Sequence, residues 1–108
     1  MSEPTKAEQL AALASEIPEH LPAGLRVLVL VWRASLTMRY CPYLIEVAAA
    51  LGRAPSTITG QVAALSDDRM VAHLNSAKRV AITYAGAALA QSIVLDARTA
   101  PKATETPR

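Results

Sequence analysis

The feature that most constrains the fold of this 108-residue chain is a break between two helical patterns at residues 52–55, Gly-Arg-Ala-Pro. Glycine adopts the left-handed conformation that ends many helices, and proline suits a first helical turn because it lacks a backbone N–H. Apolar residues recur at helical spacing on both sides of the break. The sequence therefore predicts two helices, near residues 42–52 and 55–67, joined by a tight turn. Their buried stripes are expected to be Leu44, Val47, Ala48 and Leu51, then Ile58, Val62 and Leu65.

A two-strand pattern follows the second helix. Residues 70–74 and 79–83 have the apolar bias of short strands, and the polar residues between them supply turn chemistry. Thr83 is placed to cap a helix, and residues 39–41 are a candidate third strand against the hairpin. Further helices are expected near residues 5–17, 22–37 and 84–97. The predicted fold class is mainly α with a small β-hairpin.

Two helices, a tight turn and a following hairpin make the plan of a winged helix-turn-helix. The chain resembles winged helix-turn-helix regulators of the MarR and ArsR type over roughly residues 22–95. The matching pieces are Val-Ala-Ala-Ala-Leu-Gly at 47–52, Pro-Ser-Thr-Ile-Thr at 55–59 and Ile-Thr-Tyr-Ala-Gly at 82–86. Arg69 departs from the family's usual glycine, and Gly60 from its usual polar or basic residue. The resemblance implies a dimeric, sequence-specific regulator of double-stranded DNA, with repression the expected effect.

In that plan, the helix at 55–67 enters the major groove and the wing at 70–83 lies on the flanking backbone. Short hydroxyls and an amide contact phosphates and base edges, and glutamine can bind adenine. The Ser56 hydroxyl can alternatively cap the helix. The cations of the turn and wing, Arg53, Lys78 and Arg79, can alternatively be ordinary solvated surface charges. The predicted DNA-binding residues are Arg53, Ser56, Thr57, Thr59, Gly60, Gln61, Asn75, Ser76, Lys78 and Arg79.

Length and composition predict one domain over residues 1–98 and a polar, proline-containing tail at 99–108, expected to be disordered. The apolar run at residues 25–32 is too short to span a membrane and is bracketed by Arg26 and Arg33. A helix apolar around most of its girth is expected to be buried on several sides, at a subunit interface as well as in the core. Trp32 is expected to lie in the core or at the subunit interface. The predicted homodimer surface comprises Leu10, Leu13, Ile17, Leu89, Ile93 and Val94.

The formal net charge is +2, and its distribution matters more than its size. Residues 1–20 carry a net charge of −3, whereas residues 39–79 carry +2. The positive excess therefore falls where DNA phosphates would lie.

Other chemistry is not expected. His20, His73 and Cys41 are scattered without metal-ligand spacing, and no phosphate loop, catalytic triad or activated nucleophile is visible, so neither an enzyme nor a cofactor is predicted. Cys41 is interpreted as a small buried hydrophobe in preference to a redox switch. One cysteine and no visible signal peptide favour the cytoplasm.

Two other functions remain open. The same fold can coat DNA as an architectural or partition-type protein. Gly60 favours this alternative, because glycine has no side chain with which to read bases. It can also serve as a protein-interaction module without DNA binding, which the small net charge allows. A small-molecule effector, the operator and the sign of regulation are not determined by the residues.

Overall fold

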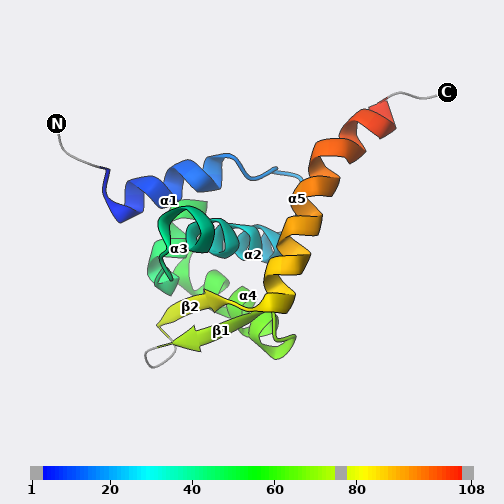
Figure 1. Cartoon of the computed structure of the whole chain (residues 1–108). Helices are drawn as coiled ribbons and strands as arrows, with labels where there is room; N and C mark the ends of the chain where they lie inside the picture. The colour runs from blue at the N-terminus through cyan, green and yellow to red at the C-terminus, as the bar shows by residue number, and fades with distance from the viewer. Residues whose placement is uncertain (1–3, 75–77, 106–108) are drawn as a thin grey trace.

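The computed structural model describes residues 4–74 and 78–105. Within them the chain is mainly helical, with one small antiparallel sheet of two strands. Figure 1 shows the helices gathered above the hairpin, with the last helix rising along one side. The elements are α1 (Lys6–Ser15), α2 (Ala23–Arg33), η1 (Ala34–Met38), α3 (Leu44–Leu51), α4 (Pro55–Asp67), β1 (Val71–Leu74), β2 (Arg79–Ile82) and α5 (Tyr84–Glu105).

Helix α2 is the centre of the molecule. Five consecutive side chains, Val27 to Val31, are at most 1% exposed. A helix buried around its whole circumference needs neighbours on all sides, and α1, α3, α4, α5 and β2 supply them from the same chain. These five residues are therefore covered by their own chain, and they have no exposed surface to contribute to the subunit interface that was expected of this run.

The helix at 22–37 was expected to be continuous, but it changes form. The α-helical part ends at Arg33 and a π-helical turn, η1, continues to Met38. Arg39 then takes a left-handed conformation with φ of 51°, which stops the helix. The Thr37 hydroxyl donates to the Arg33 carbonyl at 2.6 Å, so a side chain competes for the helical hydrogen bonds where the form changes.

The predicted pair α3 and α4 is present, with the break where the sequence places it. Gly52 is left-handed (φ 67°, ψ 36°), and the Arg53 N–H donates back to the Ala48 carbonyl at 2.9 Å. Ala54 is the N-cap of α4 and Pro55 its first residue. The second helix buries its predicted stripe of Ile58, Val62 and Leu65.

The hairpin pairs β1 with β2 in the register Val71↔Ile82 through Leu74↔Arg79. The third strand predicted at 39–41 is wrong in position. The contact is a single bridge between Tyr43 and Arg79, with the Val80 N–H donating to the Pro42 carbonyl at 2.9 Å.

Helix α5 starts as predicted, since the Thr83 hydroxyl accepts the Gly86 N–H at 3.0 Å. It ends later than expected. Residues 99–105, assigned to a disordered tail, continue the helix to Glu105, while residues 106–108 lie outside the described part. None of the described helices combines the length and hydrophobicity that crossing a membrane requires.

Candidate nucleic-acid interface

The outer face of α4 consists of small polar side chains. Its inner stripe is buried against the body of the molecule, which leaves Ser56, Thr57, Thr59 and Gly60 exposed on the opposite side. Figure 1 shows α4 and the hairpin together at the lower end of the molecule. The second helix of the pair and the candidate wing are therefore neighbours in space, as they are in sequence.

The hydroxyls on this face are not equivalent. The Thr59 hydroxyl donates to the Pro55 carbonyl at 2.9 Å, so its donor is used within the helix while its oxygen can still accept. Ser56 lies at the second helical position, and the N-cap Ala54 makes no side-chain bond, so the capping interpretation of Ser56 is not supported. A Cβ added to Gly60 would meet no atom within 4 Å, so the surface there is open.

Gln61 does not lie where the predicted base-reading role requires. It is half-buried, and a Cβ on Gly24 would lie 2.9 Å from its Oε1. The side chain thus reaches back to the first turn of α2, away from the outer face. The sequence predicts Gln61 on the outward face of this helix, but its amide occupies the space that Gly24, which has no side chain, leaves beside α2.

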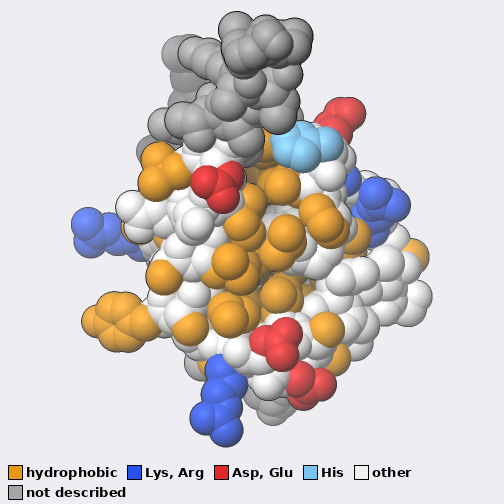
Figure 2. All heavy atoms as spheres, turned by 90° about the vertical axis from the view of Figure 1, so that its right-hand side faces the viewer, with side chains coloured by type: hydrophobic (Ala, Val, Ile, Leu, Met, Phe, Trp, Pro, Cys, Tyr) orange, Lys and Arg blue, Asp and Glu red, His pale blue; other side chains and the backbone are white. Residues whose placement is uncertain are grey.

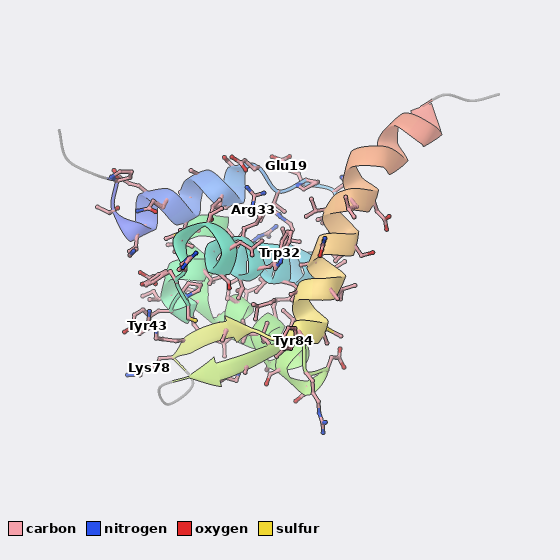
Figure 3. All side chains as sticks on the ribbon, in the orientation of Figure 1. Glu19, Trp32, Arg33, Tyr43, Lys78 and Tyr84 are labelled. Atoms are coloured by element: carbon pink, nitrogen blue, oxygen red, sulfur yellow. The ribbon has the colours of Figure 1, made fainter. Side chains whose placement is uncertain are left out.

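Arg79 is occupied within the chain. Its Nε donates to the Cys41 carbonyl at 2.8 Å, and its guanidinium lies 5.1 Å from the Tyr40 ring centroid and 4.7 Å from that of Tyr43. These contacts hold β2 to the segment before α3. The phosphate contact expected of Arg79 stays a prediction, and it would have to use the guanidinium nitrogens other than Nε. Its neighbour Lys78 is exposed at the turn beside Tyr43 (Figure 3). The predicted contacts Asn75 and Ser76 lie outside the described residues.

Tyr40 is the middle of this cation–aromatic cluster, which we define as Lys6, Tyr40, Tyr43, Glu46 and Arg79. The Tyr40 hydroxyl donates to Glu46 Oε1 at 2.7 Å, and Lys6 Nζ lies 5.0 Å from the ring centroid. The pKa of Tyr40 is raised to about 12, first by burial and then by the hydrogen bond to Glu46 and its negative charge, while Arg79 opposes the rise. The cluster joins three segments distant in sequence, at residues 6, 40–46 and 79, so no local pattern could have indicated it.

Two predicted residues do come together, with a third that the sequence did not assign. Arg53 and Thr57 line a small pocket with Arg26 of α2; its other walls are Ala23, Leu51 and Ile58. In the sequence Arg26 is one cation inside an apolar run, and only the packing of α2 against the α3–α4 turn brings it to this pocket. Spacing along the chain gives no signal for that contact.

The residues predicted for a dimer surface separate into three groups by exposure. Leu10 and Ile17 are 0% and 4% exposed, so they belong to the core of the single chain and cannot cover a partner. Leu13, Ile93 and Val94 are half-buried against that core. Leu89 is exposed.

An apolar face nevertheless exists. Figure 2 shows hydrophobic side chains gathered on the α5 side of the molecule, with charged groups around the margin. On η1 and α5 the exposed large hydrophobic side chains are Leu36, Tyr84, Leu89 and Leu95. Between these elements and β2 lies a hollow of about 440 Å³. The hollow is lined by Trp32, Ser35, Leu36, Ile82, Thr83, Tyr84 and Ala87.

Across the described part of the chain, no three His, Cys, Asp or Glu side chains gather to hold a metal ion. Cys41 is a half-buried free cysteine whose carbonyl is used by Arg79. Comparison with protein-family models, curated proteins and solved structures found no match to this chain. Function is therefore inferred from the residues and their geometry.

Proposed function

We propose that this chain is a winged helix-turn-helix protein that binds double-stranded DNA as a homodimeric transcriptional regulator, with repression by operator occupancy in the cytoplasm. The observation that carries the proposal is the exposed outer face of α4, made of small polar residues and lying beside a hairpin. A helix with such a face can approach base edges closely, and the hairpin can lie on the flanking backbone.

Charge supports the same orientation. Arg53, in the turn before α4, and Lys78, at the tip side of the hairpin, are both exposed on segments that flank this face. Cations in these places can contact phosphates on either side of a groove, which gives affinity without sequence information. With Gln61 turned back to α2, direct base reading falls to the hydroxyls of Ser56, Thr57 and Thr59.

The proposed second subunit packs on the apolar face of η1 and α5. A twofold dimer needs a self-complementary surface. This face carries a projecting aromatic side chain, Tyr84, which is 98% exposed and borders the hollow lined by Trp32 and Leu36. Each Tyr84 could therefore enter the hollow of the other subunit. Such a pair would present two α4 helices to successive major grooves, about 34–36 Å apart on one side of the duplex.

The test is fluorescence anisotropy of labelled duplexes at two salt concentrations, with the protein's own upstream DNA compared with random DNA. Tight, salt-sensitive binding to one upstream fragment is the expected result. Equal binding to both duplexes would instead favour the DNA-coating function, for which the inward turn of Gln61 is the supporting observation. Absence of salt-dependent binding to either duplex would contradict DNA binding and favour a protein-interaction module.

A pair of variants tests the assigned face. Gly60→Glu places a carboxylate on the outer face of α4, where the added Cβ meets no neighbour, so the fold should be kept. Repulsion from phosphates should weaken binding by about tenfold or more. Ala11→Glu makes the same charge change on the exposed surface of α1 and should leave affinity almost unchanged. Equal losses in the two variants would contradict the assignment of α4 as the recognition helix.

A further inference from the structure

Gly24 occupies a helical position that does not require glycine. It is the second residue of α2, and its backbone is not left-handed, unlike that of Gly52. Glycine is disfavoured relative to alanine within helices, so the backbone gives no reason for it here. A Cβ at this position would lie 2.9 Å from Gln61 Oε1 and 4.0 Å from Gln61 Cδ, and it would meet no other neighbouring atom of the described residues within 4 Å. What Gly24 supplies is therefore room for the Gln61 side chain.

The Gln61 amide occupies that room without a hydrogen bond. Helices α2 and α4 pack against each other, and Gln61 is half-buried where they meet. Within the described part of the chain its side chain has no hydrogen-bond partner, and neither of its polar atoms is fully shielded from water. Packing alone therefore holds the amide toward α2. Because the amide is the far end of a flexible side chain, a methyl group at position 24 should displace it and leave the backbone in place.

A displaced Gln61 side chain has space on the outer side of α4. Long side chains on a helix lean toward the preceding turn, so Gln61 can reach the residue four positions earlier, which is Thr57. Thr57 and Ala64, its neighbours on that side, are both small and exposed. The amide would then lie at the edge of the polar outer face that carries the proposed function.

We propose that Gly24 is a positioning residue that sets the sequence preference of α4, because it keeps the Gln61 amide off the outer face. The inference rests on the proposed function and deepens it, since it names the residue that withholds adenine reading from the recognition helix. Glutamine binds adenine in the major groove through two hydrogen bonds. Alanine at position 24 turns the amide outward and gives α4 this contact, whereas the native chain reads DNA through short hydroxyls.

The first measurement is a double-mutant cycle of Gly24→Ala and Gln61→Ala in DNA binding. Fluorescence anisotropy is recorded with the upstream duplex and with duplexes in which one of its base pairs is changed at a time. Gly24→Ala should gain about tenfold in preference for adenine at one position. The double variant is the matched control, because it keeps the new methyl group and lacks the amide, and it should show no gain.

Gln61→Ala by itself should leave the base preference of the wild type unchanged. Loss of an existing adenine preference in this single variant would overturn the inference, because the amide would then already read bases in the native chain. Melting temperatures accompany each binding curve. That of Gly24→Ala should equal or exceed the wild type, since alanine favours the helix and only a side-chain end has to move.

A second measurement locates the amide in the absence of DNA. Nuclear Overhauser contacts of the Gln61 side-chain amide protons should reach the α-protons of Gly24 in the wild type. In Gly24→Ala they should reach the Thr57 methyl group instead. A merely structural role of Gly24 would change stability without moving these contacts from one helix to the other.

The two measurements separate this inference from the proposed function. If the amide moves as described but neither protein binds DNA, the proposed function fails and the positioning of Gln61 by Gly24 stands. If the amide of Gly24→Ala stays beside α2, the inference is overturned while DNA binding is unaffected. Movement of the amide without a change in base preference, in a protein that binds DNA, would overturn it as well.

Discussion

Arg69 closes α4 with a left-handed backbone, φ 61°, where glycine would be free of strain. Its N–H donates to the Ser66 carbonyl at 2.9 Å and its own carbonyl accepts the Thr83 hydroxyl at 2.8 Å, so the conformation is fixed by the turn between α4 and β1. A Cβ in this region costs about 1–2 kcal/mol. The departure from glycine that the sequence revealed is therefore a real point of strain.

Replacing Arg69 with glycine should raise the free energy of unfolding by about 0.5–1 kcal/mol, because relief of the strain exceeds the added chain entropy of glycine. Urea unfolding of the wild type and the variant measures this change in free energy. Asp68→Gly is the control: its φ is −86°, so glycine there brings only the entropy cost and should destabilise. If Arg69→Gly were as destabilising as Asp68→Gly, the strain would be refuted.

Adding one methyl group should change the free energy of unfolding in opposite directions at Gly86 and at Gly60. A Cβ at Gly86 would overlap the Met70 carbonyl oxygen and lie 2.9 Å from Ile82 Cδ1, so Gly86→Ala should lower the free energy of unfolding by about 3 kcal/mol. Gly60 lies within a helix with open space around it, so Gly60→Ala should raise that free energy by about 0.5–1 kcal/mol. Thermal melts of the two variants measure both changes in stability. Similar melting temperatures would contradict the tight contact between α5 and the turn.

At the scale of elements, the hairpin is held to the helices by the cation–aromatic cluster. Arg79 of β2 stacks near two tyrosines that precede α3, and Glu46 of α3 accepts both the Tyr40 hydroxyl and the Tyr43 N–H. Contacts between a cation and an aromatic ring contribute about 0.5–2 kcal/mol each. The cluster thus fixes the direction of the hairpin relative to α4, which matters for any surface that uses both.

The raised pKa of Tyr40 predicts a stability loss in alkali. Below about pH 10 the phenol is neutral in both the folded and the unfolded chain, so its contribution is complete. Between pH 10 and about 12 the unfolded chain loses the proton while the folded chain keeps it, so stability falls as pH rises. The urea midpoint should therefore fall further between pH 9 and pH 11 in the wild type than in Tyr40→Phe. Tyr84→Phe, which removes a phenol from a 98% exposed side chain, is the control.

An equal fall in the wild type and in Tyr40→Phe would show that Tyr40 does not couple to folding. A fall in Tyr84→Phe as small as that in Tyr40→Phe would show that the effect is not specific to the cluster.

At the scale of the whole molecule, the apolar face of η1 and α5 predicts association. Tyr84→Ala removes a side chain that is 98% exposed, so it should hardly alter the stability of one chain, yet it should weaken the dimer by about tenfold or more. Sedimentation equilibrium measures the change. Ile45→Ala on α3 is the matched control, since that side chain is 66% exposed and lies off this face.

A wild type that remains monomeric at high concentration would refute the dimer. A dimer unaffected by Tyr84→Ala but weakened by Ile45→Ala would place the interface on α3.

The sequence by itself determined the elements and several of their ends. Gly52, Pro55 and Thr83 act through their own backbone or through residues three or four positions away, so their signals are local and the structure bears them out. The inward stripes are likewise set by helical periodicity. The full length of α5 was missed because Pro101 and the polar composition of residues 99–108 indicate a tail, yet the helix continues to Glu105. The π-helical turn was missed because neither glycine nor proline occurs at residues 34–38.

Tertiary structure alone decided which contacts the candidate site residues make within the chain. Arg79 and Gln61 look exposed and polar in sequence, yet one meets tyrosines 36 or more positions away and the other fills the space left by Gly24. Arg26 gained its place beside Arg53 in the same way. Long polar side chains choose partners across the packed elements, and periodicity carries no information on which distant segment supplies them.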